Sequence, residues 1–190
     1  MAFNITDFRS SFKKFEPASP TNYEVNIIRP PILIYSNGIN QLTDNTTENN
    51  LKYRCFQCAF PGKMMNTSDR LTYGPNRKVV TNAVYQDVTF SFIVSDNMQE
   101  KNYFSNWHNA IVNNTTEDGV SSHDVQYYSS YVGSLNITQF NKNGDKSLIV
   151  ELQEAYPINV EEVALGWEMN NEYTRINVTM AYRIWVTKSL

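Results

Sequence analysis

The stretch TRINVTMAYRIWV, residues 174–186, decides the fold. Apolar side chains occupy every second position of it: Ile176, Val178, Met180, Tyr182, Ile184 and Val186. Because successive side chains of an extended chain point to opposite faces, this period of two predicts one long β-strand whose even-numbered face is buried. The chain is therefore expected to fold around β-sheets.

The same alternation recurs along the chain. It predicts a strand from residue 23 to the prolines at 30–31, and further strands at residues 51–60, 84–94, 125–140 and 147–154. Asn143-Gly144 separates the last two, and an Asn-Gly step between alternating segments is typical of an antiparallel hairpin. The polar residues 36–50 are expected to form an exposed loop or hairpin tip.

Helical spacing appears in two places. Apolar side chains between residues 103 and 111 predict a helix over 97–112, with Ser95-Asp96 offering the N-cap. A shorter stripe predicts a helix over 5–15 within an N-terminal arm, residues 1–16, which must dock on its own domain or on a neighbouring subunit. The expected fold is mainly β: two packed antiparallel sheets, as a β-sandwich or partly open barrel, with one flanking α-helix and a short N-terminal helix.

The overall charge of the chain excludes one class of function. The chain of 190 residues has 16 basic and 19 acidic side chains, a formal net charge of −3. This balance excludes a protein that holds nucleic acid by bulk positive charge. An export signal is not expected, because polar residues interrupt the apolar ones at the start of the sequence. A membrane span is not expected either, because no run of apolar residues is long enough to cross a bilayer. Without a repeat or linker, residues 1–190 are expected to form a single domain.

Candidate catalytic and metal-binding residues are few. Cys55 and Cys58 form a lone C-x-x-C, which we interpret as structural thiols because a zinc site needs four ligands. His108 follows the apolar stripe of the predicted helix and is interpreted as structural. His123 lies in Ser121-Ser122-His123-Asp124, where adjacency in sequence is weak evidence for a catalytic triad. No enzyme activity, cofactor or metal site is therefore expected.

The connection at residues 63–78 is long for a compact domain. It contains Met64-Met65 and Tyr73-Gly74-Pro75. Loops of more than about 12–15 residues without secondary structure are uncommon unless they have a function. We therefore predict a functional role for this segment, the alternative being an ordinary surface loop.

Four short segments near the C-terminus follow one another in a characteristic order: EAYPINV (154–160), LGW (165–167), NNEY (170–173) and YRIW (182–185). Taken in this order, they resemble the end of the tail tube protein of contractile-tailed, myovirus-type bacteriophages. In the family, an aromatic-Pro-x-Asn-Val step leads through a short helix into the final two strands. The middle of the chain contributes FPG (60–62), GPNRKV (74–79), SDN (95–97) and the pair Phe104 and Trp107. The likeness covers residues 17–187.

The resemblance implies two packed antiparallel sheets with a helix at the side, in subunits similar to the tube-forming protein of type VI secretion. It implies hexameric rings whose inner strands close into one barrel and which stack into the inner tail tube, the conduit for DNA ejection through the host envelope. It also implies that residues 63–78 form an extended loop reaching neighbouring subunits, with Tyr73, Arg77 and Lys78 as its leading assembly residues.

The implied partners are further copies of the chain, the tail sheath, the baseplate or tube initiator, and the tail terminator. The implied location is the virion, assembled in the cytoplasm of the bacterial host. Phage DNA would pass through without tight binding, because a neutral or acidic wall does not retain it. The polar faces of the long strands supply the candidate lumen residues Asp87, Thr89, Ser91 and Glu151.

Two alternatives stay open at this point. One is a tube initiator or other baseplate protein of the same fold. The other belongs to a different class: a secreted glycan-binding β-sandwich module that uses its Tyr and Asn side chains and forms a monomer or small oligomer.

Overall fold

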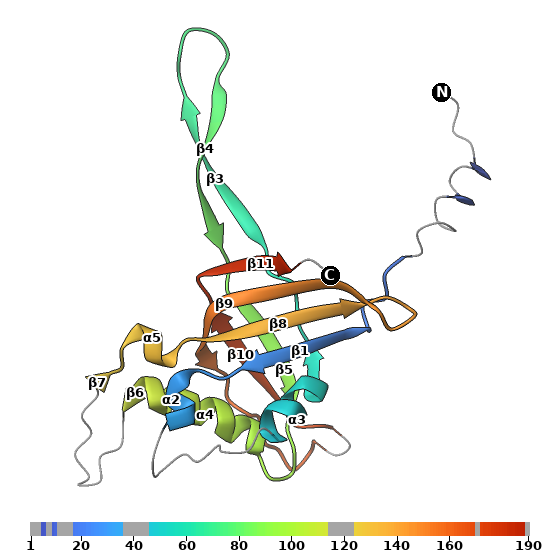
Figure 1. Cartoon of the computed structure of the whole chain (residues 1–190), viewed down its shortest axis with the longest axis vertical. Helices are drawn as coiled ribbons and strands as arrows, with labels where there is room; N and C mark the ends of the chain where they lie inside the picture. The colour runs from blue at the N-terminus through green and yellow to red at the C-terminus, as the bar shows by residue number, and fades with distance from the viewer. Residues whose placement is uncertain are drawn as a thin grey trace.

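The fold is a curled antiparallel sheet built around one long strand. The computed structural model describes residues 5–6, 9–10, 17–35, 46–113, 124–169 and 172–188. Its main sheet has seven strands in the order β1-β8-β9-β10-β5-β2, with β11 paired to β9 (Figure 1). These strands are β1 (Tyr23–Ile28), β2 (Cys55–Gln57), β5 (Val88–Ile93), β8 (Gly133–Phe140), β9 (Lys146–Val160), β10 (Arg175–Ala181) and β11 (Ile184–Lys188).

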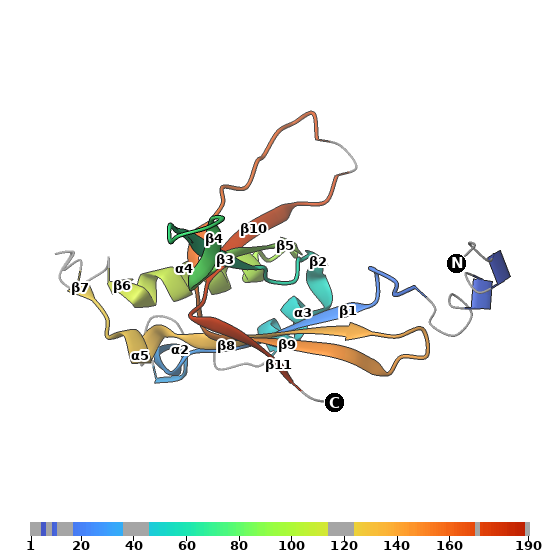
Figure 2. The same cartoon turned by 90° about the horizontal axis from the view of Figure 1, so that it is seen from above.

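Strand β9 belongs to two layers of this sheet. Most of its length pairs with β8 on one side and β11 on the other, whereas its last residues, 156–160, pair with β10. The first layer is therefore β1, β8, β9 and β11, and the second layer is the end of β9 with β10, β5 and β2. Figure 2 shows the two layers one above the other. Helix α3 (Thr46–Arg54) contacts β1 of the first layer and β5 of the second.

The hydrophobic core lies between the two layers. Its members are Val25, Ile27, Leu135, Ile137, Val150 and Leu152 from the first layer, Phe90, Phe92, Ile176, Val178 and Met180 from the second, and Tyr103, Phe104 and Trp107 from helix α4 (Gln99–Ile111). Within each strand these are every second residue, as the alternation predicts. The predicted mainly β, antiparallel fold with a flanking helix is thereby confirmed.

Helix α4 confirms the helix predicted over 97–112. Its Trp107 is fully buried, and the indole Nε1 donates a hydrogen bond to the carbonyl of Tyr131 at 2.9 Å. The N-cap differs from the prediction. The cap position is Met98, in a left-handed conformation with φ of 53°, and the side chain of Ser95 donates to Glu100 instead.

The strand predicted over residues 51–60 is wrong. Residues up to Arg54 belong to α3, and only Cys55–Gln57 are extended. In α3, Leu51 and Thr47 are buried, and three ion pairs connect the helix to distant segments: Arg29–Glu48 at 2.6 Å, Lys52–Glu24 at 3.0 Å and Arg54–Glu100 at 3.2 Å. Of the polar stretch 36–50, residues 36–45 lie outside the described residues.

The stretch 174–186 forms two strands rather than one. Strand β10 ends at Ala181 and β11 begins at Ile184, and the even-numbered face is fully buried only as far as Met180. Between them, the hydroxyl of Tyr182 donates to the Gln86 carbonyl at 2.8 Å, and the Arg183 amide donates to the Gln153 carbonyl at 3.1 Å. The chain breaks here because β9, the partner of both strands, passes from one layer to the other.

Two further predicted strands are also divided. Residues 84–94 separate at Gln86 and Asp87 into β4 (Arg77–Tyr85) and β5, and residues 125–140 separate into β7 (Asp124–Val125), α5 (Tyr128–Tyr131) and β8. By contrast, the strand predicted over 147–154 is confirmed and continues to Val160.

The remaining elements are short. Helix α2 (Pro31–Tyr35) follows β1, and β6 (Val112–Asn113) pairs with β7. Residues 5–6 and 9–10 are helical, as predicted for the N-terminal helix, and the other residues of 1–16 lie outside the described part of the chain. None of the helices described here is both long and apolar enough to cross a membrane.

Candidate assembly surfaces

A long β-hairpin projects from the body (Figure 1). It consists of β3 (Lys63–Arg70) and β4 (Arg77–Tyr85), which pair from Lys63 opposite Tyr85 to Arg70 opposite Arg77. Gly74, with φ of 109°, supports the turn, because this region of φ is open to glycine and strained for other residues. The connection predicted at 63–78 is therefore an ordered hairpin that continues to residue 85.

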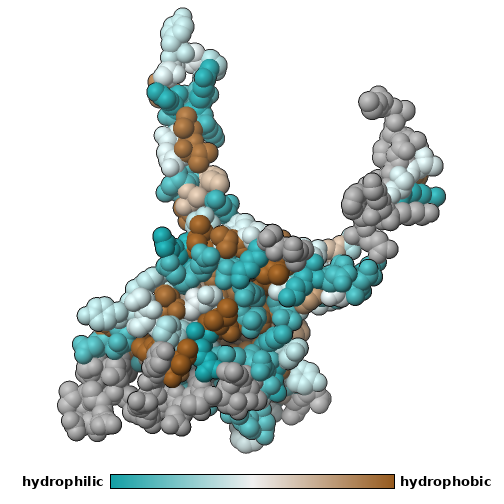
Figure 3. Space-filling model, in the orientation of Figure 1, coloured by the Kyte–Doolittle hydropathy of each residue, from teal (hydrophilic) through white to brown (hydrophobic). Residues whose placement is uncertain are grey.

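The hairpin exposes apolar side chains on both faces. Met64 and Met65 are adjacent and point to opposite faces, as do Val79 and Val80, yet all four are about half exposed. Figure 3 shows hydrophobic residues along the hairpin. In the described part of the chain, β3 and β4 form strand pairs only with each other. Because an isolated two-stranded hairpin is marginally stable, these faces are expected to be covered by another molecule.

The three predicted assembly residues lie at the outer end of the hairpin. Tyr73 is in the turn and fully exposed, and Arg77 and Lys78 begin β4. Arg77 lies opposite Arg70, and Lys78 lies opposite Asp69. Among the described residues, neither Arg77 nor Lys78 forms an ion pair. The structure therefore brings these three residues together at a solvent-exposed tip.

The candidate lumen residues Thr89 and Ser91 lie on the outer face of the second layer. They alternate with core residues of β5 and contact the polar residues of β10 beside them. The hydroxyls of Thr89 and Thr179 are 3.0 Å apart, and the Ser91 hydroxyl donates to Asn177 Oδ1 at 2.5 Å. Asp87 is exposed just before β5. Neutral hydroxyls and amides occupy the middle of this face, and the charged residues Asp87 and Arg175 lie toward its two ends.

The fourth candidate, Glu151, lies on the outer face of the first layer. It alternates with the core residues Val150 and Leu152 of β9, and its carboxylate pairs with Lys188 of β11 at 3.2 Å. It lines a shallow hollow of about 380 Å³ together with Ile28, Arg29, Val132, Gly133, Ser134, Gln153 and Glu154. The structure thus separates Glu151 from Thr89 and Ser91, because the core lies between the two outer faces.

The first layer has two open edges. Its order is β1-β8-β9-β11, and within the described ranges each of the outer strands β1 and β11 pairs on one side only. The pairs β1–β8, β8–β9 and β9–β11 are all antiparallel, so β1 and β11 run in opposite directions. A copy of this layer placed beside it, with β11 next to β1, therefore continues the antiparallel alternation.

The sequence as a whole matches one family. A family model described as phage tail tube protein matches residues 18–188. The chain belongs to the phage tail tube protein family. This confirms the resemblance found in the sequence and assigns the protein a structural role in a tube. No curated protein sequence matches the chain significantly.

Solved structures of related architecture support the fold. A chain of the sheath-tube complex of PVC, an extracellular contractile injection system, matches with a TM-score of 0.61 and 11% identity, covering 95% of this chain and 97% of that chain. The tube-terminating cap of the anti-feeding prophage matches with a TM-score of 0.59 and 14% identity, covering 92% of each chain. A type six secretion system protein aligns less well, at 0.46 and 7%, covering 87% of this chain and 82% of that chain.

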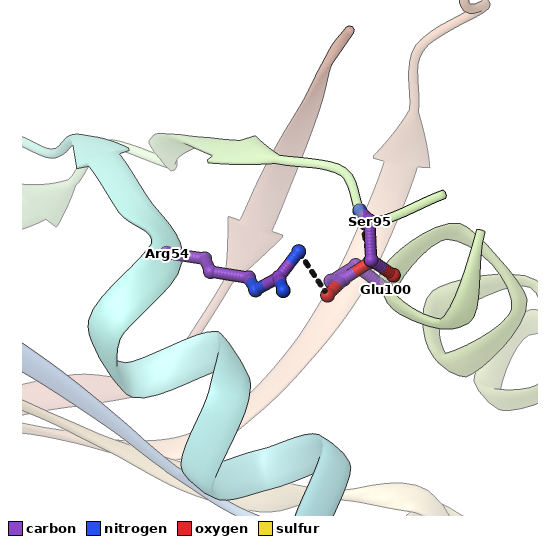
Figure 4. Close-up of polar contacts among 3 residues, drawn as sticks. All are labelled: Arg54, Ser95 and Glu100. Carbon is purple, nitrogen blue, oxygen red and sulfur yellow. Dashed lines mark hydrogen bonds and ion pairs between the residues drawn. The ribbon is translucent and has the colours of Figure 1, made fainter. Parts of the chain in front are cut away.

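A buried carboxylate connects the end of α3 to the segment between β5 and α4 (Figure 4). Glu100 has no exposed surface, and its Oε2 accepts hydrogen bonds from the Ser95 amide at 2.8 Å and the Ser95 hydroxyl at 2.7 Å. Its Oε1 lies 3.2 Å from Arg54 Nη1, at the junction between α3 and β2. Burial by itself raises the pKa of Glu100, but the hydrogen bonds from Ser95 and the charge of Arg54 outweigh it and hold the pKa below its ordinary value.

The cysteines and His108 occupy structural positions. Cys55 and Cys58 are free thiols at and beyond β2 and are partly buried. His108 Nε2 lies 3.1 Å from the Pro157 carbonyl, and burial lowers the pKa of His108 despite this contact. Within the described residues, no three His, Cys, Asp or Glu side chains form a group able to hold a metal ion. His123 lies outside these residues.

Proposed function

We propose that six copies of this protein close into a ring and that the rings stack into the inner tail tube of a contractile-tailed phage. The observation that carries the proposal is the projecting hairpin, whose apolar side chains on both faces stay about half exposed among the residues that the structure describes. In a member of the tail tube family, a second copy is the natural cover. Tyr73, Arg77 and Lys78 are then contact residues between subunits.

Ring closure is proposed to use the first layer. A β11-to-β1 contact between neighbouring copies pairs both open edges and leaves none exposed, which removes the aggregation hazard of unpaired strands. Every copy then contributes β1, β8, β9 and β11 to one continuous barrel. Since one face of this layer is the core, the other face lines the lumen.

With the first layer around the lumen, the four candidate lumen residues fall on different sides of the tube wall. Glu151 faces the conduit, whereas Asp87, Thr89 and Ser91 lie on the outer side of the tube. The other polar residues that the described strands place on the luminal face are Glu24, Asn26, Ser134, Asn136, Thr138, Gln153 and Lys188. On this face the acidic residues Glu24 and Glu151 accompany Lys188, the basic residue that its strands carry. DNA that passes such a wall releases few counterions and is bound weakly, so that it slides during ejection through the host envelope.

The proposed assembly defines the partners. The tube is enclosed by a tail sheath, starts on a baseplate or tube initiator and ends at a tail terminator, in a virion assembled in the host cytoplasm. An initiator or baseplate protein of the same fold is the second candidate, because a chain of the anti-feeding prophage baseplate has a similar fold, with a TM-score of 0.60 and 10% identity. Its copies would form one ring without stacking. Neither role involves catalysis.

Electron microscopy and native mass spectrometry of the purified protein test this function. Hexamers by mass and stacked rings in images are expected, and their amount should rise steeply with protein concentration. Rings that never stack would instead favour the initiator. A strict monomer at high concentration would overturn both.

A further inference from the structure

The segment between β9 and β10 forms a second projection. We define the acidic arm as residues 161–169 and 172–174. It has no helix where the sequence resemblance implies one, apart from a turn closed by the Met169 amide and the Gly166 carbonyl at 3.1 Å. Trp167 is fully exposed, and Leu165 and Tyr173 are more than three-quarters exposed. Such side chains on one projecting segment mark an interaction surface.

The charges of the arm are of one sign. It carries Glu161, Glu162, Glu168 and Glu172 and no basic residue. All four are exposed, and none forms an ion pair with another described residue. Glu161 is the one that accepts a hydrogen bond, from Asn177 Nδ2 at 2.8 Å. The other three carboxylates have no charge partner within the described chain.

The hairpin has the opposite charge. Lys63, Arg70, Arg77 and Lys78 outnumber the single acidic residue Asp69 between residues 63 and 85. Like the arm, the hairpin combines these charges with exposed apolar side chains. The two projections therefore have opposite charges, and both expose apolar surface. At protein interfaces, complementary charges favour the correct partner and apolar side chains form the buried contact.

Their positions prevent them from meeting within one chain. Figure 1 places the hairpin at one end of the long axis and the acidic arm, in brown, at the opposite side of the body. Figure 2 shows the arm extending outward from β10. A contact between two different surfaces of identical molecules is heterologous, and it repeats from each copy to the next.

We infer that the acidic arm is the receptor for the basic hairpin of another copy of this chain, in the adjacent ring. Beside the arm lies a hollow of about 660 Å³, lined by Leu165, Met169 and Tyr173 among others, with Glu172 and Arg175 as its charged residues. The Tyr73 side chain at the hairpin tip enters this hollow, and Arg77 and Lys78 approach Glu168 and Glu172. This inference rests on the proposed stacking of rings and names the two surfaces that stack.

A charge exchange tests the pairing. The variants R77E/K78E in the hairpin and E168K/E172K in the arm each place like charges together, so each alone should raise the protein concentration needed for tubes by about tenfold or more. The protein carrying all four substitutions should form tubes at close to the wild-type concentration. K146E, an exposed charge reversal on β9, is the matched control and should assemble normally.

Trp167 provides a second measurement. Its indole is fully exposed in the single chain, whereas Trp107 is buried and Trp185 is partly buried. Assembly should shift its emission to shorter wavelength and protect it from acrylamide, and W167F should lack this change.

The outcomes separate this inference from the function. If E168K/E172K assembles like the wild type, or if the fourfold variant fails to recover, the receptor assignment is wrong while wild-type tubes still support the proposed function. If the wild type forms neither rings nor tubes, the proposed function itself is wrong.

Discussion

At the scale of single residues, Glu100 shows how a polar group can be retained in the core. Its carboxylate is fully buried and receives two hydrogen bonds from Ser95 and the charge of Arg54. A buried charge without partners costs several kcal/mol, so these contacts have to persist together. They join the end of α3, the start of α4 and Ser95, which closely follows β5.

Replacing Glu100 tests this anchor. E100Q removes the charge and should lower the free energy of unfolding by roughly 1–3 kcal/mol at neutral pH. Since the pKa of Glu100 is lowered in the folded protein, its charge stabilises the fold above the ordinary carboxyl pKa, and this contribution disappears as the pH falls through the folded-state pKa. Urea titrations at neutral and acidic pH should therefore show the gap between E100Q and wild type closing in acid. E162Q, at an exposed acid, should show no gap at either pH.

Gly133 is a second position at which a single added atom should change the stability of the fold. A Cβ there would lie 2.5 Å from the Ile28 carbonyl oxygen and 3.2 Å from Trp107. G133A should therefore push β8 away from β1 or α4 and destabilise the fold by about 1–3 kcal/mol. Thermal unfolding measures the effect against G62A, whose Cβ meets no atom within 4 Å. Equal melting temperatures for the two variants would show that the backbone at Gly133 has room to move.

At the scale of elements, the sequence predicts what local periodicity controls. The core faces of β5, β8 and β10 and the stripe of α4 follow directly from apolar spacing. Helix α3 was missed because ion pairs to Glu24, Arg29 and Glu100 hold it, and such partners are invisible to a local pattern. The break at Tyr182 and Arg183 was missed because the alternation continues through it, although the partner strand changes layers.

The hairpin was found as a segment with a function but not as ordered strands. Its exposed positions show little alternation, since neither face packs on the body. Tyr73, Arg77 and Lys78 were predicted from the resemblance and lie together at the tip. The acidic arm was not predicted as a functional surface, because the exposure of Trp167 and the position of the arm opposite the basic hairpin are visible only in the structure.

Shortening the hairpin separates folding from assembly. Deleting residues 66–82 and joining Met65 to Ala83, its cross-strand partner, through Asn-Gly retains a hairpin stub with a favourable turn. Because the removed part packs on nothing else described, the melting temperature should change by less than about 4 °C. Electron microscopy should show rings at most, and no tubes. Normal tubes from this variant would remove the hairpin's assembly role.

At the scale of the whole molecule, the two polar faces determine which way the subunit points in a ring. Among the described strands, the first layer has two open, mutually antiparallel edges, whereas the second is joined to the first through the end of β9 and has its outer edge at β2. Only a layer open at both edges extends into a closed barrel through identical contacts. The sequence alone supplied polar residues on both faces, because alternation cannot tell which layer has the free edges.

Accessibility in assembled tubes tests this orientation. In a background with Cys55 and Cys58 replaced by serine, E151C should react with a small maleimide but not with a large PEG-maleimide, because the latter enters the lumen only from the tube ends. T89C, on the outer side of the tube, should react with both reagents. Unassembled protein, in which both positions react freely, is the control for intrinsic reactivity. The reverse pattern, with T89C protected and E151C open, would mean that the second layer lines the conduit and that ring closure does not use the β1 and β11 edges.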